Sequence, residues 1–247
     1  KDQLVTFVPQ NNEFRYSAAD LMEYFGSHHA DNILIINPDN PSGNFIPFAD
    51  VLRLASWGEE RGVRVIIDES FVDFSIGYEN NTLLHNEILE QYPHLVVMKS
   101  ISKSYGVPGI RLGILCSADK EIIVKMKKMV SIWNINSFAE FFMQIFNKYE
   151  KDYKKACDKF ITEREDFEQK LKEIPFLRVM PSQANYFLCE ILPPMTANTL
   201  VLTMLKRFNI LMRDCSDKKG FDGKQYMRIA VRSHEDNARL IAAFKQM

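Results

Sequence analysis

The sequence predicts an α/β protein whose mostly parallel sheet is followed by a small α+β domain. Two observations predict this fold class. Short apolar runs alternate with helical patterns in the first part of the chain, and polar residues gather directly after those runs. Strands that alternate with helices form parallel sheets, and ligands bind beyond the carboxyl ends of such strands. We therefore place the domains at 1–147 and 148–247.

The elements of the first part follow from apolar runs and helix caps. Ser17 with Asp20 fits a capping box, and the helix that it begins ends at Gly26. A second helix starts near Pro47 and ends at Gly62. The run 33–36 is all apolar and is expected to be a parallel strand buried on both faces. The other expected strands are 4–8, 63–67, 95–98 and 112–116.

The second part begins with a long helical pattern. Residues 138–174 contain no glycine or proline and keep apolar residues at helical spacing. They predict one long helix, or two joined by a bend, with a coiled coil as the alternative. Helices are then expected at 196–209 and after Ser233, together with strands at 177–180, 185–189, 210–212 and 227–231.

Composition excludes several function classes. The 247 residues are 46% hydrophobic and 26% charged, with a net charge of −1, so there is no basic footprint for nucleic acid or an anionic membrane. No apolar run is long enough to span a bilayer. Adjacent His28 and His29 do not share a helix face, so no metal site is expected. The four cysteines are scattered, which favours reduced thiols in a cytoplasmic protein: Cys116, Cys157, Cys189 and Cys215.

The stretch 98–113 carries the most distinctive chemistry. The apolar run 95–98 leads into it, and Ser100, Ser102, Lys103, glycines and Arg111 follow. The amine of Lys103 can form an imine with a carbonyl compound. Hydroxyls and a guanidinium can hold a phosphate group: Ser100, Ser102 and Arg111. This combination favours pyridoxal 5'-phosphate (PLP) as cofactor.

PLP chemistry makes two further demands, and the sequence has a residue for each. The pyridine nitrogen needs a carboxylate partner, which Asp68 can supply at the end of its strand. The 3-oxygen needs a hydrogen-bond donor, which the amide of Asn40 can supply. Each residue alone has a plainer interpretation: Asn40 as part of a turn, Asp68 as a helix cap, Lys103 as a surface lysine. The specific feature is the whole set, each member following an apolar run.

Several sequence motifs resemble those of a known protein family, and they occur in the same order along the chain as in that family. They are Asn37-Pro38-Asp39-Asn40-Pro41-Ser42-Gly43, Asp68-Glu69-Ser70-Phe71-Val72-Asp73-Phe74, Ser100-Ile101-Ser102-Lys103 with Arg111, Ala184-Asn185-Tyr186-Phe187, Ile210-Leu211-Met212-Arg213-Asp214 and Met227-Arg228-Ile229-Ala230-Val231-Arg232. The chain resembles the fold-type-I PLP-dependent enzymes, class I/II aminotransferases. Within them it is most similar to histidinol-phosphate aminotransferases and threonine-phosphate decarboxylases.

The resemblance implies a PLP-dependent transferase fold and a role for each site residue. Lys103 would anchor the cofactor and move the proton, and Asp68 would pair with the pyridinium. Asn40 and the residue at Phe71 would face the 3-oxygen, and Ser100, Ser102 and Arg111 would hold the phosphate. Arg228 would bind the substrate carboxylate and Arg213 a substrate phosphate. From the residues alone, salt bridges are the favoured interpretation of Arg213 and Arg228.

The sequence departs from the family pattern in two ways. Phe71 stands where relatives commonly have tyrosine, which predicts a less acidic lysine–cofactor imine, and Lys99 stands where they often have arginine. The chain also starts late: the family's upstream segment, with its phosphate cup, its stacking aromatic ring and its N-terminal arm, has no counterpart before Asn37. We therefore expect these residues alone to bind PLP weakly or not at all.

Three functions remain open at this point. The first is aminotransfer between an amino acid or amino-phosphate and a 2-oxoacid, the majority activity of the resembled family. The second is decarboxylation of a threonine-phosphate-like substrate, and the third is a non-catalytic PLP-fold domain of a fusion protein. By the same resemblance we expect a homodimer.

Overall fold

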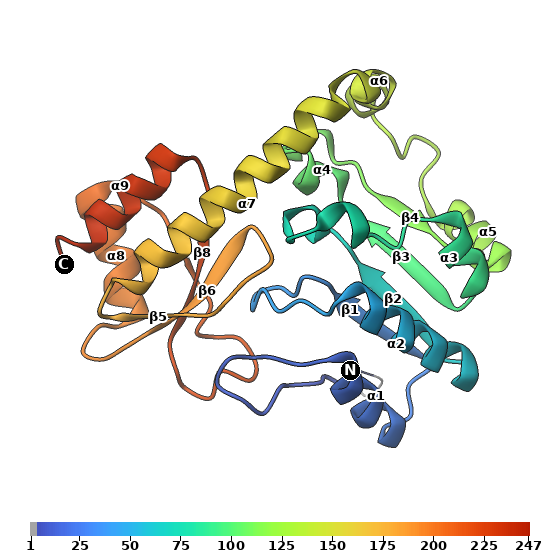
Figure 1. The fold of residues 1–247 in the computed structure, drawn as a ribbon, viewed down its shortest axis with the longest axis horizontal. Coiled ribbons are helices and arrows are strands. Elements are labelled where there is room, and N and C mark those ends of the chain that lie inside the picture. The colour runs from blue at the N-terminus through green and yellow to red at the C-terminus, as the bar shows by residue number, and fades with distance from the viewer. Residues whose placement is uncertain (1–3) are drawn as a thin grey trace. The chain divides into compact units, whose positions relative to one another are not determined.

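The computed structural model describes residues 4–247 and groups the chain into two compact units (Figure 1). The first contains the residues up to Phe7, Tyr16–Pro38 and Phe45–Cys157. The second contains Val8–Arg15, Asp39–Asn44 and Asp158–Met247. The chain therefore changes unit inside the helix α7 (Glu150–Lys172). The division at residue 147 stays a prediction.

The first unit is built on a four-stranded sheet of order β1-β2-β3-β4. The three parallel strands are β1 (Asn32–Ile36), β2 (Arg64–Asp68) and β3 (Leu95–Lys99), and β4 (Ile114–Cys116) lies antiparallel beside β3. Its helices are α1 (Ala18–Ser27), α2 (Phe48–Arg61), α3 (Asn86–Gln91), α4 (Ile101–Ser104), α5 (Lys120–Met129) and α6 (Ser137–Ile145). A mostly parallel α/β arrangement was predicted and is confirmed.

One face of this sheet carries the core of the unit. Alternate residues of β1–β3, such as Ile35 and Ile67, pack against buried residues of α1 and α2 and partly buried ones of α3. The opposite face is less covered, because Leu34 of β1 is 60% exposed. The prediction that 33–36 is buried on both faces is therefore wrong. Residues 4–8 form no strand either, and Leu4 is 81% exposed.

The predicted helix ends agree with the structure. Ser17 and Asp20 form both hydrogen bonds of a capping box at the start of α1. Gly62 ends α2 in the left-handed conformation that glycine adopts without strain. The long pattern 138–174 forms two helices, α6 and α7, joined by a 3-10 turn (Phe146–Tyr149).

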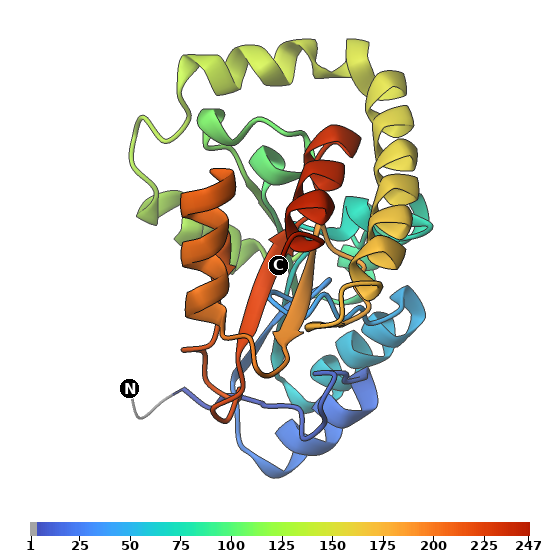
Figure 2. The same cartoon turned by 90° about the vertical axis from the view of Figure 1, so that its left-hand side faces the viewer.

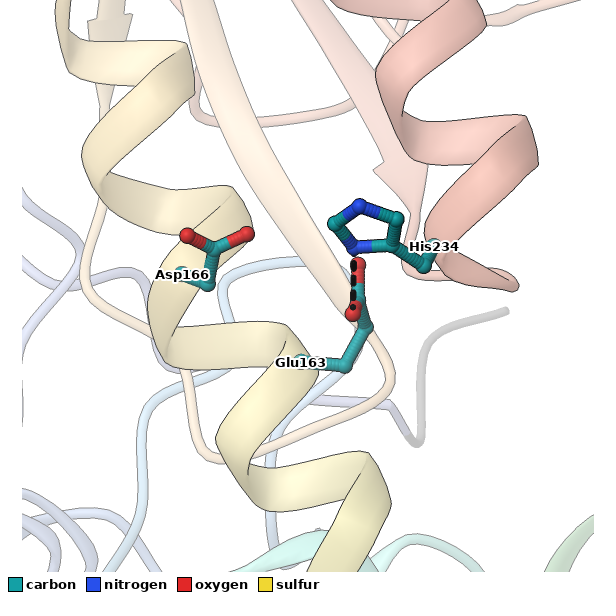
Figure 3. Close-up of side chains that lie close together, drawn as sticks. All are labelled: Glu163, Asp166 and His234. Carbon is teal, nitrogen blue, oxygen red and sulfur yellow. Dashed lines mark hydrogen bonds and ion pairs between the residues drawn. The ribbon is translucent and has the colours of Figure 1, made fainter.

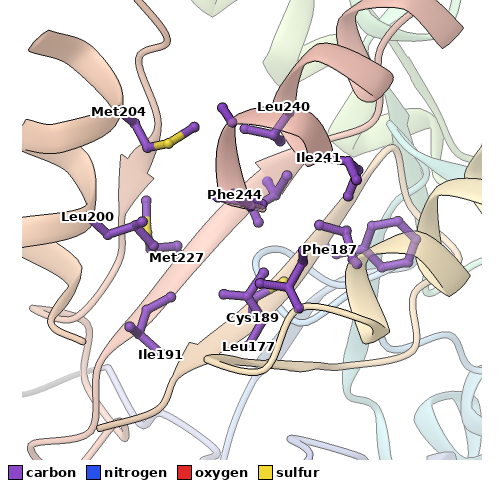
Figure 4. Packing of buried hydrophobic residues seen from close by; sticks show 14 of the residues in the cluster. Leu177, Phe187, Cys189, Ile191, Leu200, Met204, Met227, Leu240, Ile241 and Phe244 are labelled. Atoms are coloured by element: carbon purple, nitrogen blue, oxygen red, sulfur yellow. The ribbon is translucent and has the colours of Figure 1, made fainter. Parts of the chain in front are cut away.

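The second unit is an antiparallel sheet covered on one face by three helices. The strands β5 (Leu177–Val179), β6 (Tyr186–Ile191), β7 (Arg213–Asp214) and β8 (Tyr226–Ala230) lie in the order β5-β6-β8-β7. The C-terminal half of α7, α8 (Ala197–Phe208) and α9 (His234–Phe244) cover one face (Figure 2). Figure 4 shows apolar side chains of α8 and α9, such as Leu200 and Phe244, beside Met227 of the sheet. Packing of α7 on a sheet leaves no role for the coiled-coil alternative.

One predicted strand of this unit is displaced. Residues 210–212 were expected to be a strand, but β7 starts only at Arg213. Leu211 is 77% exposed. The chain therefore does not pair with Ile229 and Ala230, and one edge of β8 stays open beside it.

Candidate active site

The carboxyl ends of β2 and β3 lie side by side in the first sheet. Asp68 is the last residue of β2 and pairs in register with Met98 of β3. Both parallel strands end here, so the segments after Asp68 and after Lys99 start from one edge of the sheet. This edge is where a mostly parallel sheet places ligand-binding groups.

Ser70 links the two segments through its hydroxyl group. Oδ1 of Asp68 accepts a hydrogen bond from the backbone N–H of Ser70 at 2.9 Å and another from the Ser70 hydroxyl. Oγ of Ser70 in turn accepts from the backbone N–H of Ser100 at 3.0 Å. The orientation of the Asp68 carboxylate is thus tied to the start of the lysine segment. Sequence reasoning missed Ser70, because a serine after a strand carries no distinctive signal.

Lys103 and Phe71 meet at the same edge. Lys103 lies in α4, and its amine is 4.6 Å from the centre of the Phe71 ring. Phe71 is buried, with 5% of its surface exposed. An ammonium group over an aromatic face is attracted by the ring quadrupole. Within residues 4–247 the amine has no carboxylate partner, so it is available to a ligand.

The predicted phosphate-binding residues are partly engaged by the backbone. Oγ of Ser102 accepts from the N–H of Leu112 at 3.0 Å and donates to its carbonyl at 3.2 Å. Arg111 has a φ of 54° and donates to the Pro108 carbonyl at 3.1 Å. Ser102 therefore closes the loop, while the exposed Arg111 guanidinium keeps N–H donors for an anion.

Asn40 belongs to the second unit and contacts an arginine there. Its Oδ1 accepts a hydrogen bond from Nη1 of Arg228 at 2.9 Å. The Arg228 guanidinium also lies over the Tyr186 ring, 5.0 Å from its centre. Because Arg228 occupies the amide oxygen, the Asn40 Nδ2 group is left to act as a donor.

The turn that carries Asn40 requires a glycine. Gly43 has a φ of 74°, and a Cβ placed on it would overlap the side chain of Ser182. The backbone also runs close here, since the N–H of Gln183 donates to the Gly43 carbonyl at 3.0 Å. Glycine at this position thus allows the Asn40 turn to pack against the segment before β6.

Arg213 and Arg228 face each other across two strands. They are register partners in the β7–β8 ladder, so their side chains leave the sheet on the same face. Two like charges in this position destabilise a sheet unless something compensates them. Arg228 contacts the neutral Asn40, and Arg213 has no hydrogen-bond or ion-pair partner among the described side chains. Neither guanidinium is therefore compensated by a carboxylate among residues 4–247.

A cavity of about 390 Å³ opens beside this pair. Its walls come from the segment before β7, from β8 and from α9. Its charged lining consists of Arg213, Arg228, Arg232, Asp236 and Arg239. The space exists because residues 210–212 leave the edge of β8.

A buried ionic cluster supports the segment after β2. Nζ of Lys99 lies 2.6 Å from Oδ1 of Asp73, and both side chains are 8% exposed. The Tyr153 hydroxyl donates to the other oxygen of Asp73 at 2.7 Å. Burial, with the Asp73 charge nearby, raises the pKa of Tyr153, so the phenol stays protonated. Sequence reasoning noted Lys99 but not its partners, which lie far away in the sequence.

Three side chains of the second unit, Glu163, Asp166 and His234, lie close enough together to be a candidate metal site (Figure 3). Oε2 of Glu163 is 3.2 Å from Nδ1 of His234, and Oε1 accepts from the Asn237 amide at 2.9 Å. Asp166 pairs with Lys170 at 2.5 Å. These partners satisfy both carboxylates, so we assign no ion to the cluster.

The predicted site residues thus form two groups. One contains Asp68, Phe71, Ser100, Ser102, Lys103 and Arg111 in the first unit. The other contains Asn40, Arg213 and Arg228 in the second unit.

A model of the family described as aminotransferase class I and II matches residues 3–244. The chain belongs to this family. Its members use PLP, and the donor set at the first sheet edge fits that cofactor: an available amine, an oriented carboxylate and an exposed guanidinium.

Relatives within the aminotransferase class I and II family carry different activities. A CMP-5'-(3-aminopropyl)phosphonate synthase of Streptomyces rubellomurinus is 32% identical over 95% of this chain and 37% of its own length. An L-serine phosphate decarboxylase of Campylobacter jejuni is 30% identical over 93% of this chain and 59% of its own length. The histidinol-phosphate aminotransferase structure from Clostridium acetobutylicum is 28% identical with a TM-score of 0.86, covering 98% of this chain and 70% of that one.

The comparisons settle the fold and leave the specific reaction open. The chain has the PLP-dependent transferase fold in part, since it spans less than two thirds of the length of the two curated relatives just described. Among residues 4–247, no helix combines the length and hydropathy needed to cross a membrane.

Proposed function

We propose that the full-length protein is a PLP-dependent enzyme that acts on a phosphorylated amino acid. The observation that carries this proposal is the pair Arg213 and Arg228. They lie opposite each other on one sheet face without a carboxylate partner among the described residues. Arg228 also donates a hydrogen bond to the amide oxygen of Asn40. A substrate with a carboxylate and a phosphate would neutralise both guanidinium groups through forked hydrogen bonds.

The residues of the first sheet edge would hold the cofactor. PLP, when bound, supplies an electron sink for charge that develops at the substrate α-carbon. Lys103 would bind the cofactor carbonyl through its amine and then move a proton at the α-carbon. Asp68, oriented by Ser70, would keep the pyridine nitrogen protonated. Ser100 and Arg111 would hold the phosphate, with Ser102 keeping their loop closed.

Asn40 would contribute its amide donor to the 3-oxygen of the ring. Its oxygen accepts from Arg228, which fixes the side chain with Nδ2 as the remaining donor. The same contact couples the substrate-binding arginine to the cofactor-binding amide. Binding of a substrate anion to Arg228 would therefore affect Asn40 through the single hydrogen bond between the two side chains.

Two reactions remain candidates, and we rank decarboxylation first. Phe71 replaces the tyrosine that the aminotransferases commonly have. In addition, the L-serine phosphate decarboxylase of Campylobacter jejuni is 30% identical to this chain over 93% of the residues of this chain. Transamination with a 2-oxoacid is the second candidate and is supported by the family name and by the histidinol-phosphate aminotransferase structure. Formation of a homodimer, which the resemblance implies, is part of this proposal.

The experiment uses full-length protein with added PLP and O-phospho-L-serine. Release of carbon dioxide supports decarboxylation, and formation of an amino acid from added 2-oxoglutarate supports transamination. Borohydride reduction followed by peptide mass analysis should find a pyridoxyl group on Lys103. The matched control is Lys99→Arg, which keeps the positive charge that pairs with Asp73. Absence of the label on Lys103 would sink the proposal and favour a non-catalytic domain.

A further inference from the structure

Tyr153, near the start of α7, contacts the two segments that carry Phe71 and Lys103. Its hydroxyl donates to Oδ2 of Asp73 at 2.7 Å. Its ring centre lies 4.3 Å from that of Tyr105, with 45° between the ring planes. Asp73 is two residues after Phe71, and Tyr105 is two residues after Lys103. All of these residues belong to the first unit, so one side chain joins both segments.

The contact with Asp73 fixes the segment that carries Phe71. Asp73 lies in the 3-10 turn Val72–Phe74, and Phe71 is the residue directly before that turn. The other oxygen of the buried Asp73 carboxylate accepts from Nζ of Lys99 at 2.6 Å. Hydrogen bonds to a charged group are stronger than those between neutral groups, and two of them fix the orientation of the carboxylate. The segment after β2 is thereby held from the end of β3 and from α7.

The contact with Tyr105 fixes the segment that carries Lys103. Tyr105 directly follows α4, and its backbone N–H donates to the Ile101 carbonyl at 3.1 Å. Its ring contacts Phe146 as well as Tyr153, with both ring centres 4.3 Å away. Aromatic rings in tilted or edge contact attract each other beyond the area that they bury. A shift of the Tyr105 ring would therefore move the end of α4, the helix that contains Lys103.

We infer that Tyr153 is a positioning residue, which keeps the Lys103 amine against the Phe71 ring for the cofactor. The amine and the ring centre come from the two segments that Tyr153 joins, and they lie 4.6 Å apart. The inference rests on the proposed function, because this arrangement serves PLP only if the site binds PLP. A ligand binds with higher apparent affinity when its site spends more time in the competent arrangement. Loosening either segment should therefore weaken PLP binding.

The first experiment measures the PLP dissociation constant of the full-length protein, together with the circular dichroism of the bound cofactor, which depends on how its ring is held. Tyr153→Phe keeps the ring beside Tyr105 and removes only the hydroxyl that bonds to Asp73. We expect the dissociation constant to rise about tenfold, the size of one hydrogen bond to a charged group. The dichroism per bound cofactor should decrease.

Tyr78→Phe is the matched control for a role of Tyr153 in anchoring α7 alone. The Tyr78 hydroxyl donates to the backbone carbonyl of Lys154 in α7 at 3.3 Å, so this variant also removes a contact of that helix. It leaves the bond between Tyr153 and Asp73 in place. If only the anchoring of α7 matters, both variants should change PLP binding equally. We expect Tyr78→Phe to stay within about twofold of the wild type.

Hydrogen exchange of the PLP-free full-length protein gives a second measurement. Tyr153→Phe should speed exchange in peptides that cover 69–75 and 100–106 by at least about threefold, and Tyr78→Phe should not. Equal exchange in wild type and Tyr153→Phe overturns the inference, as does an unchanged PLP dissociation constant when Lys103 carries the pyridoxyl label. A missing label on Lys103 in the wild type would instead refute the enzyme proposal. Exchange in the two segments would then decide whether Tyr153 holds them.

Discussion

The Lys99–Asp73 pair shows how much one buried contact controls at the residue scale. Both groups are nearly removed from water, and each charge is compensated only by its neighbours. Removing one partner of a buried pair leaves the other charge uncompensated, which costs more than the pair itself contributes. The segment that carries Phe71 therefore depends on Asp73 for its position.

We expect Asp73→Asn to lower the free energy of unfolding by about 3–5 kcal/mol, because Lys99 stays buried without its counter-charge. Urea denaturation measures this change. Asp166→Asn is the control: it removes the exposed partner of Lys170 and should cost less than about 1 kcal/mol. If the two variants lost the same free energy of unfolding, burial of the Lys99–Asp73 pair would have no effect on the size of the loss.

Glu69 gives a pH dependence with a definite sign. It is 1% exposed, and burial raises its pKa above the ordinary 4.5, although hydrogen bonds from Leu83 and Thr82 oppose the shift. Between 4.5 and the raised pKa, the folded state binds more protons than the unfolded state. This contribution to stability is therefore complete below 4.5, falls as pH rises through that window, and is constant above it.

Glu69→Gln should remove this component, so the stability difference between wild type and variant should change as pH rises from about 4. Denaturation across a pH series measures the slope of each protein. Glu87→Gln, on the first turn of α3, serves as the control and should keep the wild-type slope. If the free energies of unfolding of wild type and Glu69→Gln changed in parallel with pH, the raised pKa of Glu69 would be contradicted.

At the scale of elements, the turn that carries Asn40 depends on Gly43. Gly43→Ala should lower stability by about 1–2 kcal/mol from its left-handed backbone, and by about 1–3 kcal/mol more from overlap with Ser182. Gly62→Ala is the matched control, because Gly62 has a similar φ of 66° with open space around it. Thermal unfolding of the two variants should differ by the overlap alone; identical losses would contradict a tight packing of the turn.

Local signals predicted the elements, and long-range contacts decided the exceptions. The helix ends at Ser17 and Gly62 were predictable because capping is local chemistry. The apolar run 210–212 is not a strand, because pairing depends on how the chain meets β8. The same limit applies to the site. Lys103 and Asp68 follow apolar runs, so the sequence could single them out as candidates, whereas Ser70 and the Asp73 cluster are defined only by contacts.

At the scale of the whole molecule, the most unusual feature is an apolar surface around α5 and α6. Four side chains there are at least 79% exposed: Met129, Ile132, Trp133 and Phe138. No residue of α5 is buried. Several large apolar side chains exposed within one short stretch of the chain are typical of an interaction site.

We expect this surface to cause self-association that the double variant Trp133→Ser/Phe138→Ser weakens, since it removes two exposed aromatic rings. Sedimentation velocity at increasing protein concentration measures the effect. Leu4→Ser/Leu211→Ser removes two exposed apolar side chains elsewhere and should leave association unchanged. Equal sedimentation of all three proteins would show that this surface makes no contact in solution.

The chain passes between its two units after residues 7, 15, 38, 44 and 157. Neither unit is therefore one continuous stretch of the gene. A single recombination breakpoint in α7 would separate β5–β8 from residues 8–15 and 39–44, including the Asn40 that Arg228 contacts. A C-terminal segment exchanged at that point would therefore bring in Arg228 without the Asn40 turn that it contacts, so compatible sequences are needed on both sides of the breakpoint.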